Sequence, residues 1–178
     1  MKKVLIISAS PRKNGNTATL YARFAQGAQE SGNVVEREFL AEKNIEYCSG
    51  CDRCSGTKRC VKNDDMRRIL ERMMRADVIV LATPVEFYSM DAQMKKLLDR
   101  LQPRYEELAE KEFYVILTSQ HTERKELERV MELFRSFIRE KLGRAGEAGC
   151  ILGTDEKRTA RIKDTAAYEE AYQMGLGV

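Results

Sequence analysis

Two short runs made only of apolar residues limit what this chain can fold into. Residues 4–7 and 78–82 carry no polar side chain, and β-branched residues are frequent in both. Such runs are typical of strands that are buried on both faces of a sheet. Each run is followed by a stretch with apolar residues at helical spacing, so we expect parallel strands joined by helices, an α/β arrangement.

The rest of the chain repeats this alternation. We expect further strands at 34–40, 113–117 and 148–152, and helices near 20–28, 66–74, 90–101, 127–142 and 168–176. Consecutive charged residues make the second strand poor in apolar side chains, which suits an edge of the sheet: Glu36, Arg37 and Glu38. We therefore predict a flavodoxin-like, doubly wound sheet of five parallel strands in the order 2-1-3-4-5, with helices on both faces. In this fold the ligand site lies beyond the carboxyl ends of strands one and three.

Length and composition narrow the class of protein. We expect residues 1–178 to form a single domain with a cysteine-rich insertion loop at about 46–62. The net charge is +3, and basic residues are interleaved with acidic ones, which argues against a nucleic-acid-binding protein. No apolar run approaches the roughly 20 residues of a membrane-spanning helix, and the N-terminus lacks the pattern of a signal peptide. We expect a cytoplasmic protein that binds neither nucleic acid nor membrane.

The loop after the first expected strand has the composition of a phosphate-binding loop. It holds small hydroxyl side chains, the guanidinium of Arg12 and Gly15, which permits a positive φ, and it leads into a helix N-terminus. Unpaired N–H groups of that first turn point at a ligand, and Ser10, Asn16 and Thr17 can add side-chain hydrogen bonds. The alternative is a polar turn in which Asn16 caps the helix. The position of the loop at the predicted switch point favours a phosphate site.

Two segments resemble the NADPH-dependent FMN reductase family. One reads SPRKNGNT at 10–17, and the other combines TPV at 83–85 with SMDAQMK at 89–95. The resemblance implies an FMN phosphate held by the first loop and an isoalloxazine ring bordered by the second. The implied contacts are Ser10, Arg12, Asn14, Gly15, Asn16 and Thr17 for the phosphate, and Pro84, Val85, Glu86, Phe87, Tyr88 and Ser89 for the ring. It also implies a homodimer or homotetramer in which loops of one subunit cover the flavin of the next.

Three positions depart from the pattern of this family. Similar proteins usually carry Tyr and Gly where this chain has Glu86 and Tyr88, and glycines near Gln120, which the resemblance places at the pyrimidine edge of the flavin. We expect Glu86 to face solvent or a partner subunit, because an inward carboxylate would disfavour an anionic reduced ring. The aromatic pair Phe87 and Tyr88 packs on the flavin or is partly buried in the loop. His121, the only histidine, is a candidate for contacting the flavin or the pyridine nucleotide, and its alternative is a solvated loop residue.

Four of the five cysteines lie within thirteen residues. They follow the spacing C-x2-C-x2-C-x5-C, and this segment resembles the archaeal-type iron–sulfur flavoproteins of the same superfamily: Cys48, Cys51, Cys54 and Cys60. Three interpretations stay open, namely ligands of a [4Fe–4S] cluster, a zinc-binding or redox-active thiol group, and cysteines without a ligand. Cys150 lies far along the chain and is expected to be a core thiol.

Together these features predict an FMN-dependent oxidoreductase. Its donor is NAD(P)H or a reduced ferredoxin, and its acceptor is a quinone, a free flavin, a peroxide or a protein. No catalytic side chain is required beyond the cofactor, although His121 is available. The alternatives are a non-enzymatic flavin and iron–sulfur electron carrier, and a zinc-stabilised interaction module with a degenerate flavin site.

Overall fold

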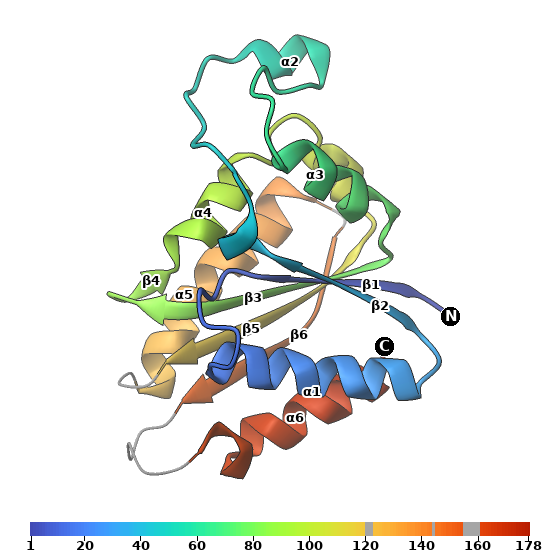
Figure 1. The fold of residues 1–178 in the computed structure, drawn as a ribbon, viewed down its shortest axis with the longest axis vertical. Helices are drawn as coiled ribbons and strands as arrows, with labels where there is room; N and C mark the ends of the chain where they lie inside the picture. The colour runs from blue at the N-terminus through green and yellow to red at the C-terminus, as the bar shows by residue number, and fades with distance from the viewer. Residues whose placement is uncertain (120–122, 144, 155–160) are drawn as a thin grey trace.

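Five parallel strands form the centre of the structure, a computed structural model that describes residues 1–119, 123–143, 145–154 and 161–178. They run in the order β2-β1-β3-β5-β6 (Figure 1). These strands are β1 (Lys3–Ser8), β2 (Val34–Phe39), β3 (Val78–Glu86), β5 (Glu112–Ser119) and β6 (Gly146–Thr154). A short strand, β4 (Ser89–Met90), pairs antiparallel with the end of β3. Counted without β4, this is the predicted order 2-1-3-4-5, which is confirmed.

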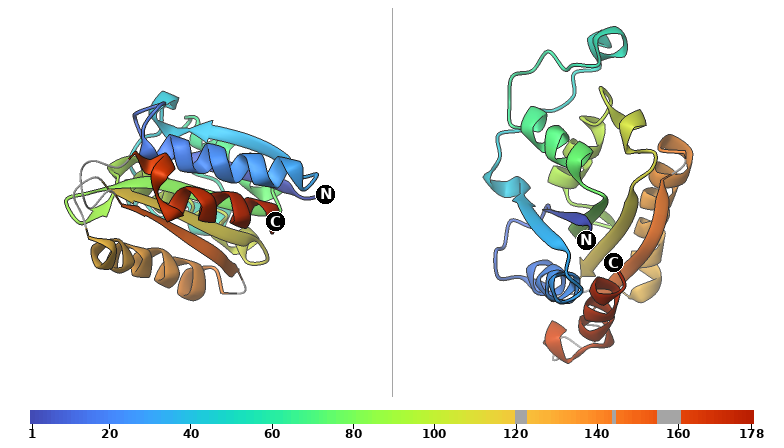
Figure 2. Two further views of the ribbon diagram at one scale, coloured as in Figure 1. Left: turned by 90° about the horizontal axis from the view of Figure 1, so that it is seen from below. Right: turned by 90° about the vertical axis from the view of Figure 1, so that its right-hand side faces the viewer.

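Helices cover both faces of the sheet, as Figures 1 and 2 show. One face carries α1 (Asn16–Glu30) and α6 (Ala166–Leu176), and the other carries α3 (Met66–Arg75), α4 (Ala92–Asp99) and α5 (Arg124–Ser136). The remaining short elements are η1 (Leu40–Glu42), α2 (Arg53–Thr57), η2 (Tyr105–Leu108), η3 (Phe137–Lys141) and η4 (Ile162–Asp164). In the described part of the chain, no helix combines the length and apolarity needed to cross a membrane.

The side chains of β1 explain why its sequence is apolar throughout. Val4 and Ile6 belong to the core under α1 and α6, whereas Leu5 and Ile7 belong to the core under α3, α4 and α5. All four are at most 2% exposed. Because alternate residues of a strand face opposite sides of the sheet, burial of both sides requires a continuous apolar run.

The edge position of β2 is confirmed, and ion pairs to α3 account for its charged residues. Arg72 donates from Nη2 to Glu36 Oε2 at 2.7 Å. Glu38 is 3% exposed and pairs with both Arg72 and Lys43. A buried carboxylate is tolerated when it is paired, so this strand closes the sheet without a second apolar face.

Most element boundaries differ by a few residues from the sequence prediction, and three of the differences have a clear local cause. The second strand ends at Phe39, because Leu40 begins the turn η1. The helix expected from residue 90 starts at Ala92, after Asp91 caps it, and β4 occupies the preceding residues. The long helix expected over 127–142 ends at Ser136 and continues as one π-helical turn. A strand of two residues is too short to show an alternating pattern, and a change from α- to π-helix leaves the spacing of apolar residues almost unchanged. Neither feature can therefore be predicted from hydrophobic periodicity.

Glycines allow α1 and α6 to cross closely. A Cβ atom on Gly175 would overlap the carbonyl oxygen of Phe24, and one on Gly27 would overlap the carbonyl oxygen of Tyr172. In both cases the obstacle is backbone, which cannot move without shifting a helix. The close crossing therefore depends on the absence of a Cβ atom at these two glycines and not on an unusual backbone angle.

We expect Gly175→Ala to lower the free energy of unfolding by about 1–3 kcal/mol, because the added methyl group overpacks the crossing. The better helix propensity of Ala offsets part of this cost. Gly177→Ala is the matched control, since its Cβ would meet nothing closer than 3.6 Å. Urea unfolding followed by circular dichroism measures both variants. Equal stability of the two would contradict the close crossing.

Candidate functional site

A cavity of about 660 Å³ lies at the carboxyl ends of β1, β3 and β5. This volume falls in the range of roughly 300–1,000 Å³ that is typical of cofactor and small-molecule sites. Three segments line it: the loop after β1, the end of β3 with its hairpin, and the end of β5. The lining residues are Ser10, Pro11, Arg12, Asn14, Gly15, Asn16, Thr17, Pro84, Val85, Glu86, Phe87, Tyr88, Asp91, Thr118 and Ser119.

The structure brings together the two loops that the sequence singled out. Every residue predicted in the first loop, and every one from Pro84 to Tyr88, lines this cavity, whereas Ser89 of β4 does not. Gln120 and His121 lie outside the described residues. Sequence reasoning missed Asp91 and Thr118, although a polar residue directly after an apolar strand is a signal that could have found Thr118.

The helix that follows the first loop begins without a side-chain cap. Gly15 is the N-cap residue of α1, and no side chain in the described ranges accepts from the first turn. Asn16 is the first helical residue, so the alternative in which it caps the helix is wrong. The N–H groups of the first turn are therefore left for a ligand at the cavity.

Gly15 serves a different purpose from the one predicted. Its φ is −83° and its ψ is −179°, which is extended backbone that needs no glycine. The constraint is space, because a Cβ atom at this position would lie 3.2 Å from the Cβ of Arg12. The loop folds back tightly on itself, and the expectation of a positive φ is wrong.

Arg12 is the cation that the loop presents at the cavity. The Ser10 hydroxyl accepts from the Arg12 N–H at 3.2 Å and donates to the Arg12 carbonyl at 3.3 Å, so Ser10 shapes the turn. The Arg12 side chain is exposed and has no ion pair within the described part of the chain. The neighbouring Lys13 pairs with Glu42 instead and is not part of the cavity lining.

A hydroxyl pair joins two walls of the cavity. The Oγ1 atoms of Thr17 and Thr118 lie 2.7 Å apart, and the two residues are 2% and 3% exposed. This bond ties the start of α1 to the end of β5. A hydroxyl can donate once and accept twice, so Thr17 retains capacity for a ligand.

Asp91 fixes the hairpin that forms the second wall. Its N–H donates to the buried Thr83 hydroxyl at 3.1 Å and to the Pro84 carbonyl at 3.3 Å. Its carboxylate accepts from the Gln93 N–H at 2.8 Å and so caps α4. The base of the hairpin is thereby anchored to both the strand and the following helix.

The hairpin tip holds two aromatic residues in an unfavourable conformation. Phe87 and Tyr88 have φ values of +48° and +61°, the region that favours glycine. A bulky residue there costs on the order of 1–3 kcal/mol. Both side chains face solvent, at 98% and 74% exposure, so the alternative of partly buried loop aromatics is wrong. Glu86 is exposed, as expected.

The cysteine loop (residues 46–62) projects from the fold beyond α3 (Figures 1 and 2). None of its residues is fully buried; Cys48 and Cys51 are exposed, and Cys54 and Cys60 are half-buried. Across the described ranges, no group of three or more His, Cys, Asp or Glu residues lies close enough to hold a metal ion. The four thiols have the chemistry of a cluster ligand set, but as arranged they do not fit one.

The cysteines differ in their surroundings. The Arg53 backbone N–H and the Ser49 side chain lower the pKa of Cys51, whereas burial and the nearby thiols raise the pKa of Cys54. Cys150 packs against the core as expected, but it is only partly buried and its sulfur accepts from Arg135 at 3.9 Å, so it lies at the edge of the core. Burial raises the pKa of this thiol.

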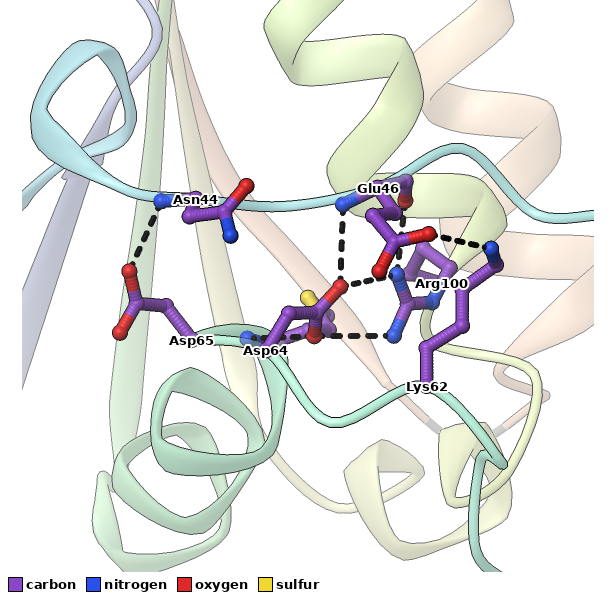
Figure 3. A network of polar contacts seen from close by, with 7 residues as sticks. Asn44, Glu46, Lys62, Asp64, Asp65 and Arg100 are labelled. Carbon is purple, nitrogen blue, oxygen red and sulfur yellow. Dashed lines mark hydrogen bonds and ion pairs between the residues drawn. The ribbon is translucent and has the colours of Figure 1, made fainter.

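Both ends of the cysteine loop are held by a polar network, the loop clamp, drawn in Figure 3. At its centre Arg100 donates from Nη1 to Asp64 Oδ2 at 2.7 Å and from Nη2 to Oδ1 at 3.1 Å, and both side chains are almost fully buried. Arg100 also donates to the Glu46 carbonyl at 2.7 Å, and Lys62 pairs with the Glu46 carboxylate at the same distance. The clamp fastens the loop to the end of α4.

The clamp sets the acidity of Asp64. Burial alone would raise the pKa of this carboxyl, but hydrogen bonds from Arg100 and from the Glu46 N–H, together with the charge of Arg100, lower it below its ordinary value. A carboxyl whose pKa is lower in the folded state stabilises the fold above its unfolded pKa, about 3.9. That contribution is lost as the pH falls through the folded-state pKa.

A doubly wound sheet with a cavity at its switch point, lined by the start of a helix and by an arginine that has no ion pair among the described residues, is typical of flavodoxin-like proteins that bind a phosphate-bearing cofactor. The chain belongs to the NADPH-dependent FMN reductase family, whose model matches residues 2–139. The family expected from the two loop motifs is confirmed.

Relatives and solved structures agree with this assignment. The chain is 42% identical over 101 residues to an iron-sulfur flavoprotein of Methanocaldococcus jannaschii, covering 57% of this chain and 52% of that one. It is 36% identical over 101 residues to an iron-sulfur flavoprotein of Archaeoglobus fulgidus, covering 57% and 46%. The chain thus spans about half the length of these relatives.

Among solved structures, an NAD(P)H:quinone oxidoreductase from Methanothermobacter marburgensis has the same fold. Its TM-score is 0.78 at 18% identity, with 98% of both chains covered. An azoreductase from Bacillus anthracis gives a TM-score of 0.79 at 16% identity and 100% coverage of both chains. At these identities the likeness concerns the fold alone.

We expect Asp64→Asn to lower the free energy of unfolding by about 3–5 kcal/mol at neutral pH, because it leaves the buried Arg100 without its counter-charge. The difference from wild type should begin to shrink below about pH 4, where the carboxyl is protonated in the unfolded chain, and should vanish as the pH falls through the lower folded-state pKa. Asp65→Asn is the control, since the Asp65 carboxylate accepts from the Asn44 N–H at 2.8 Å and, among the described contacts, forms no hydrogen bond or ion pair with Arg100. Urea titrations at several pH values measure the effect, and a difference independent of pH would contradict the lowered pKa.

Proposed function

We propose that the chain binds FMN in the cavity at the carboxyl edge of the sheet and acts as an FMN-dependent oxidoreductase. The observation that carries this proposal is the start of α1 beside Arg12, where the described residues provide neither a side-chain cap nor an ion-pair partner, in a chain of the FMN reductase family. Free N–H groups and a free guanidinium suit a dianionic phosphate. The opposite wall offers the exposed aromatic hairpin to a flat ring.

The residues of the cavity divide into two groups. Arg12, Asn16 and the first-turn N–H groups of α1 would hold the phosphate, while Pro84 to Tyr88 would border the ring. Thr118, which lies beside Pro84 in the sheet, completes the cavity together with Ser119. When bound, FMN supplies hydride and electron transfer, and the side chains bind it, orient it and limit its contact with water.

The donor and acceptor belong to this proposal as well. Membership of an NADPH-dependent family supports NAD(P)H as the donor, with a reduced ferredoxin as the alternative. The acceptor is a quinone, a free flavin, a peroxide or a protein. A homodimer or homotetramer would cover the open side of the cavity. The five free thiols support a reducing, cytoplasmic location.

We expect Arg12→Ala to weaken FMN binding by about 10- to 100-fold, because a hydrogen bond to a charged group is worth about 1.5–3 kcal/mol. Its affinity for riboflavin, which lacks the phosphate, should stay within about twofold of wild type. Fluorescence titration of the flavin-free protein measures both affinities.

Lys13→Ala is the matched control, because it removes the same charge from the adjacent residue, which pairs with Glu42 away from the cavity. It should change neither affinity. An equal loss of FMN and riboflavin binding in Arg12→Ala would place the phosphate elsewhere, and wild-type protein without affinity for FMN would refute the proposal.

The second candidate is an electron carrier that joins flavin and an iron–sulfur centre without binding a nicotinamide. The spacing of Cys48, Cys51, Cys54 and Cys60 and the names of the relatives favour it. The observed arrangement of the thiols does not, so this function requires the cysteine loop to change conformation. The clamp holds the two ends of the loop, including Cys60 through Arg100, and does not contact the stretch that carries Cys48, Cys51 and Cys54.

We expect anaerobic treatment with iron and sulfide to give cluster absorbance in wild type and in Cys150→Ser, but not in Cys54→Ser. The reason is that Cys150 lies outside the loop, whereas Cys54 is central to its spacing. Absorbance spectra and iron analysis measure the outcome. Absence of cluster absorbance in wild type would refute this candidate, and bound zinc without flavin would support an interaction module instead.

A further inference from the structure

A second cavity, of about 440 Å³, lies between the end of the cysteine loop, the first turns of α3 and the chain that follows α4. Its volume is typical of small-molecule sites. It shares no lining residue with the cavity at the carboxyl edge of the sheet, so the proposed FMN site makes no use of it.

The wall of this second cavity is rich in N–H donors. Among the described residues that line it, one is acidic, Glu71, and six are basic: Lys58, Arg59, Lys62, Arg67, Arg100 and Arg104. Arg67 pairs with Glu71, and four of the others pair with carboxylates outside the lining. Arg59 is exposed and makes no ion pair with any described residue. The wall therefore favours an anionic ligand.

Arg100 contributes a buried donor that lacks a partner. This residue is 2% exposed, and both of its terminal nitrogens are used in the loop clamp (Figure 3). Its Nε–H is buried as well and has no hydrogen-bond partner in the described part of the chain. Cys60 lies beside the guanidinium, but a thiol sulfur is only a weak acceptor. A buried donor of this kind stabilises a ligand that brings an oxygen atom to it.

Apolar residues complete the lining. Met66 and Leu70 are 1% and 6% exposed, Pro103 is buried, and Val61 is 52% exposed. A methionine thioether makes favourable contacts with flat rings, and arginine guanidinium planes stack on nucleic-acid bases. A long alkyl chain would need a continuous apolar wall, whereas here the apolar side chains alternate with cations. The mixture suits a flat ring that carries a phosphate.

We propose that this cavity binds a nucleoside monophosphate. Its phosphate accepts hydrogen bonds from Arg59 and from the Arg100 Nε–H, and its base packs on Met66, Leu70 and Pro103. Because the cavity is walled by residues 57–63 of the cysteine loop as well as by α3 and the end of α4, the ligand holds the loop against the sheet domain.

The test is calorimetric titration with adenosine 5′-monophosphate, adenosine and inorganic phosphate at pH 7.5, where the nucleotide phosphate is a dianion. FMN-loaded protein is used, so that the cavity at the carboxyl edge is occupied. We expect the nucleotide to bind at least tenfold more tightly than either of its parts. In ¹⁵N-labelled protein the Arg100 Nε–H signal should move downfield on binding, and hydrogen exchange of residues 57–63 should slow.

Two variants probe the two halves of the site. Arg59→Ala should raise the Kd of the nucleotide about tenfold and leave that of adenosine within about twofold. Val61→Ser should weaken both ligands about threefold, because it removes an apolar contact. The matched controls are Arg53→Ala in the same loop and Val34→Ser on β2, since neither residue lines the cavity. Both controls should bind like wild type.

Other results would overturn the proposal. Equal affinities for the nucleotide and inorganic phosphate would leave an ion site without a base, and tighter binding of decanoate would replace the ligand class. Loss of nucleotide binding in Arg12→Ala would place the nucleotide in the FMN cavity. Absence of nucleotide binding in protein that binds FMN would refute this proposal alone, whereas protein that binds the nucleotide but no FMN would refute only the proposed function.

Discussion

Burial of the central strands on both faces is the constraint from which the rest of the structure follows. β1 alternates its side chains between two cores, and β3 does the same, with Ile79 and Leu81 in one core and Val78 and Val80 in the other. Because helices must return the chain across the sheet to keep the strands parallel, every strand ends at the same edge. The cavity therefore collects the ends of three strands that are far apart in sequence.

The cavity walls contain local features that lower the stability of the protein when no ligand is bound. The first turn of α1 lacks a side-chain cap, Arg12 has no ion-pair partner within the described ranges, and two aromatic residues adopt positive φ. Elsewhere buried charged side chains form ion pairs, as Glu38 does with Arg72 and Asp64 does with Arg100. Local departures of this kind gather where a protein meets its ligand, because the ligand supplies the missing partners.

The cysteine loop follows a different principle from the sheet. It contributes no fully buried residue, and its position depends on charge pairs at its two ends rather than on packing. Such a segment can rearrange without disturbing the core, since none of its residues is fully buried. Similarity to iron-sulfur flavoproteins and an arrangement of the described thiols that does not form a metal site are therefore compatible properties of one loop.

The sequence by itself determined the strand order, the two loops of the cavity and the family, because hydrophobic periodicity and loop composition are local properties. Only the tertiary structure decided the roles of individual residues. Gly15 leaves room for the side chain of Arg12, Thr17 is bonded to Thr118, and Asp91 anchors the hairpin. These relations depend on how the loops and strands lie against one another in space, and they leave no pattern along the chain. The loop clamp could not be predicted from the sequence either, because its arginine and aspartate are thirty-six residues apart.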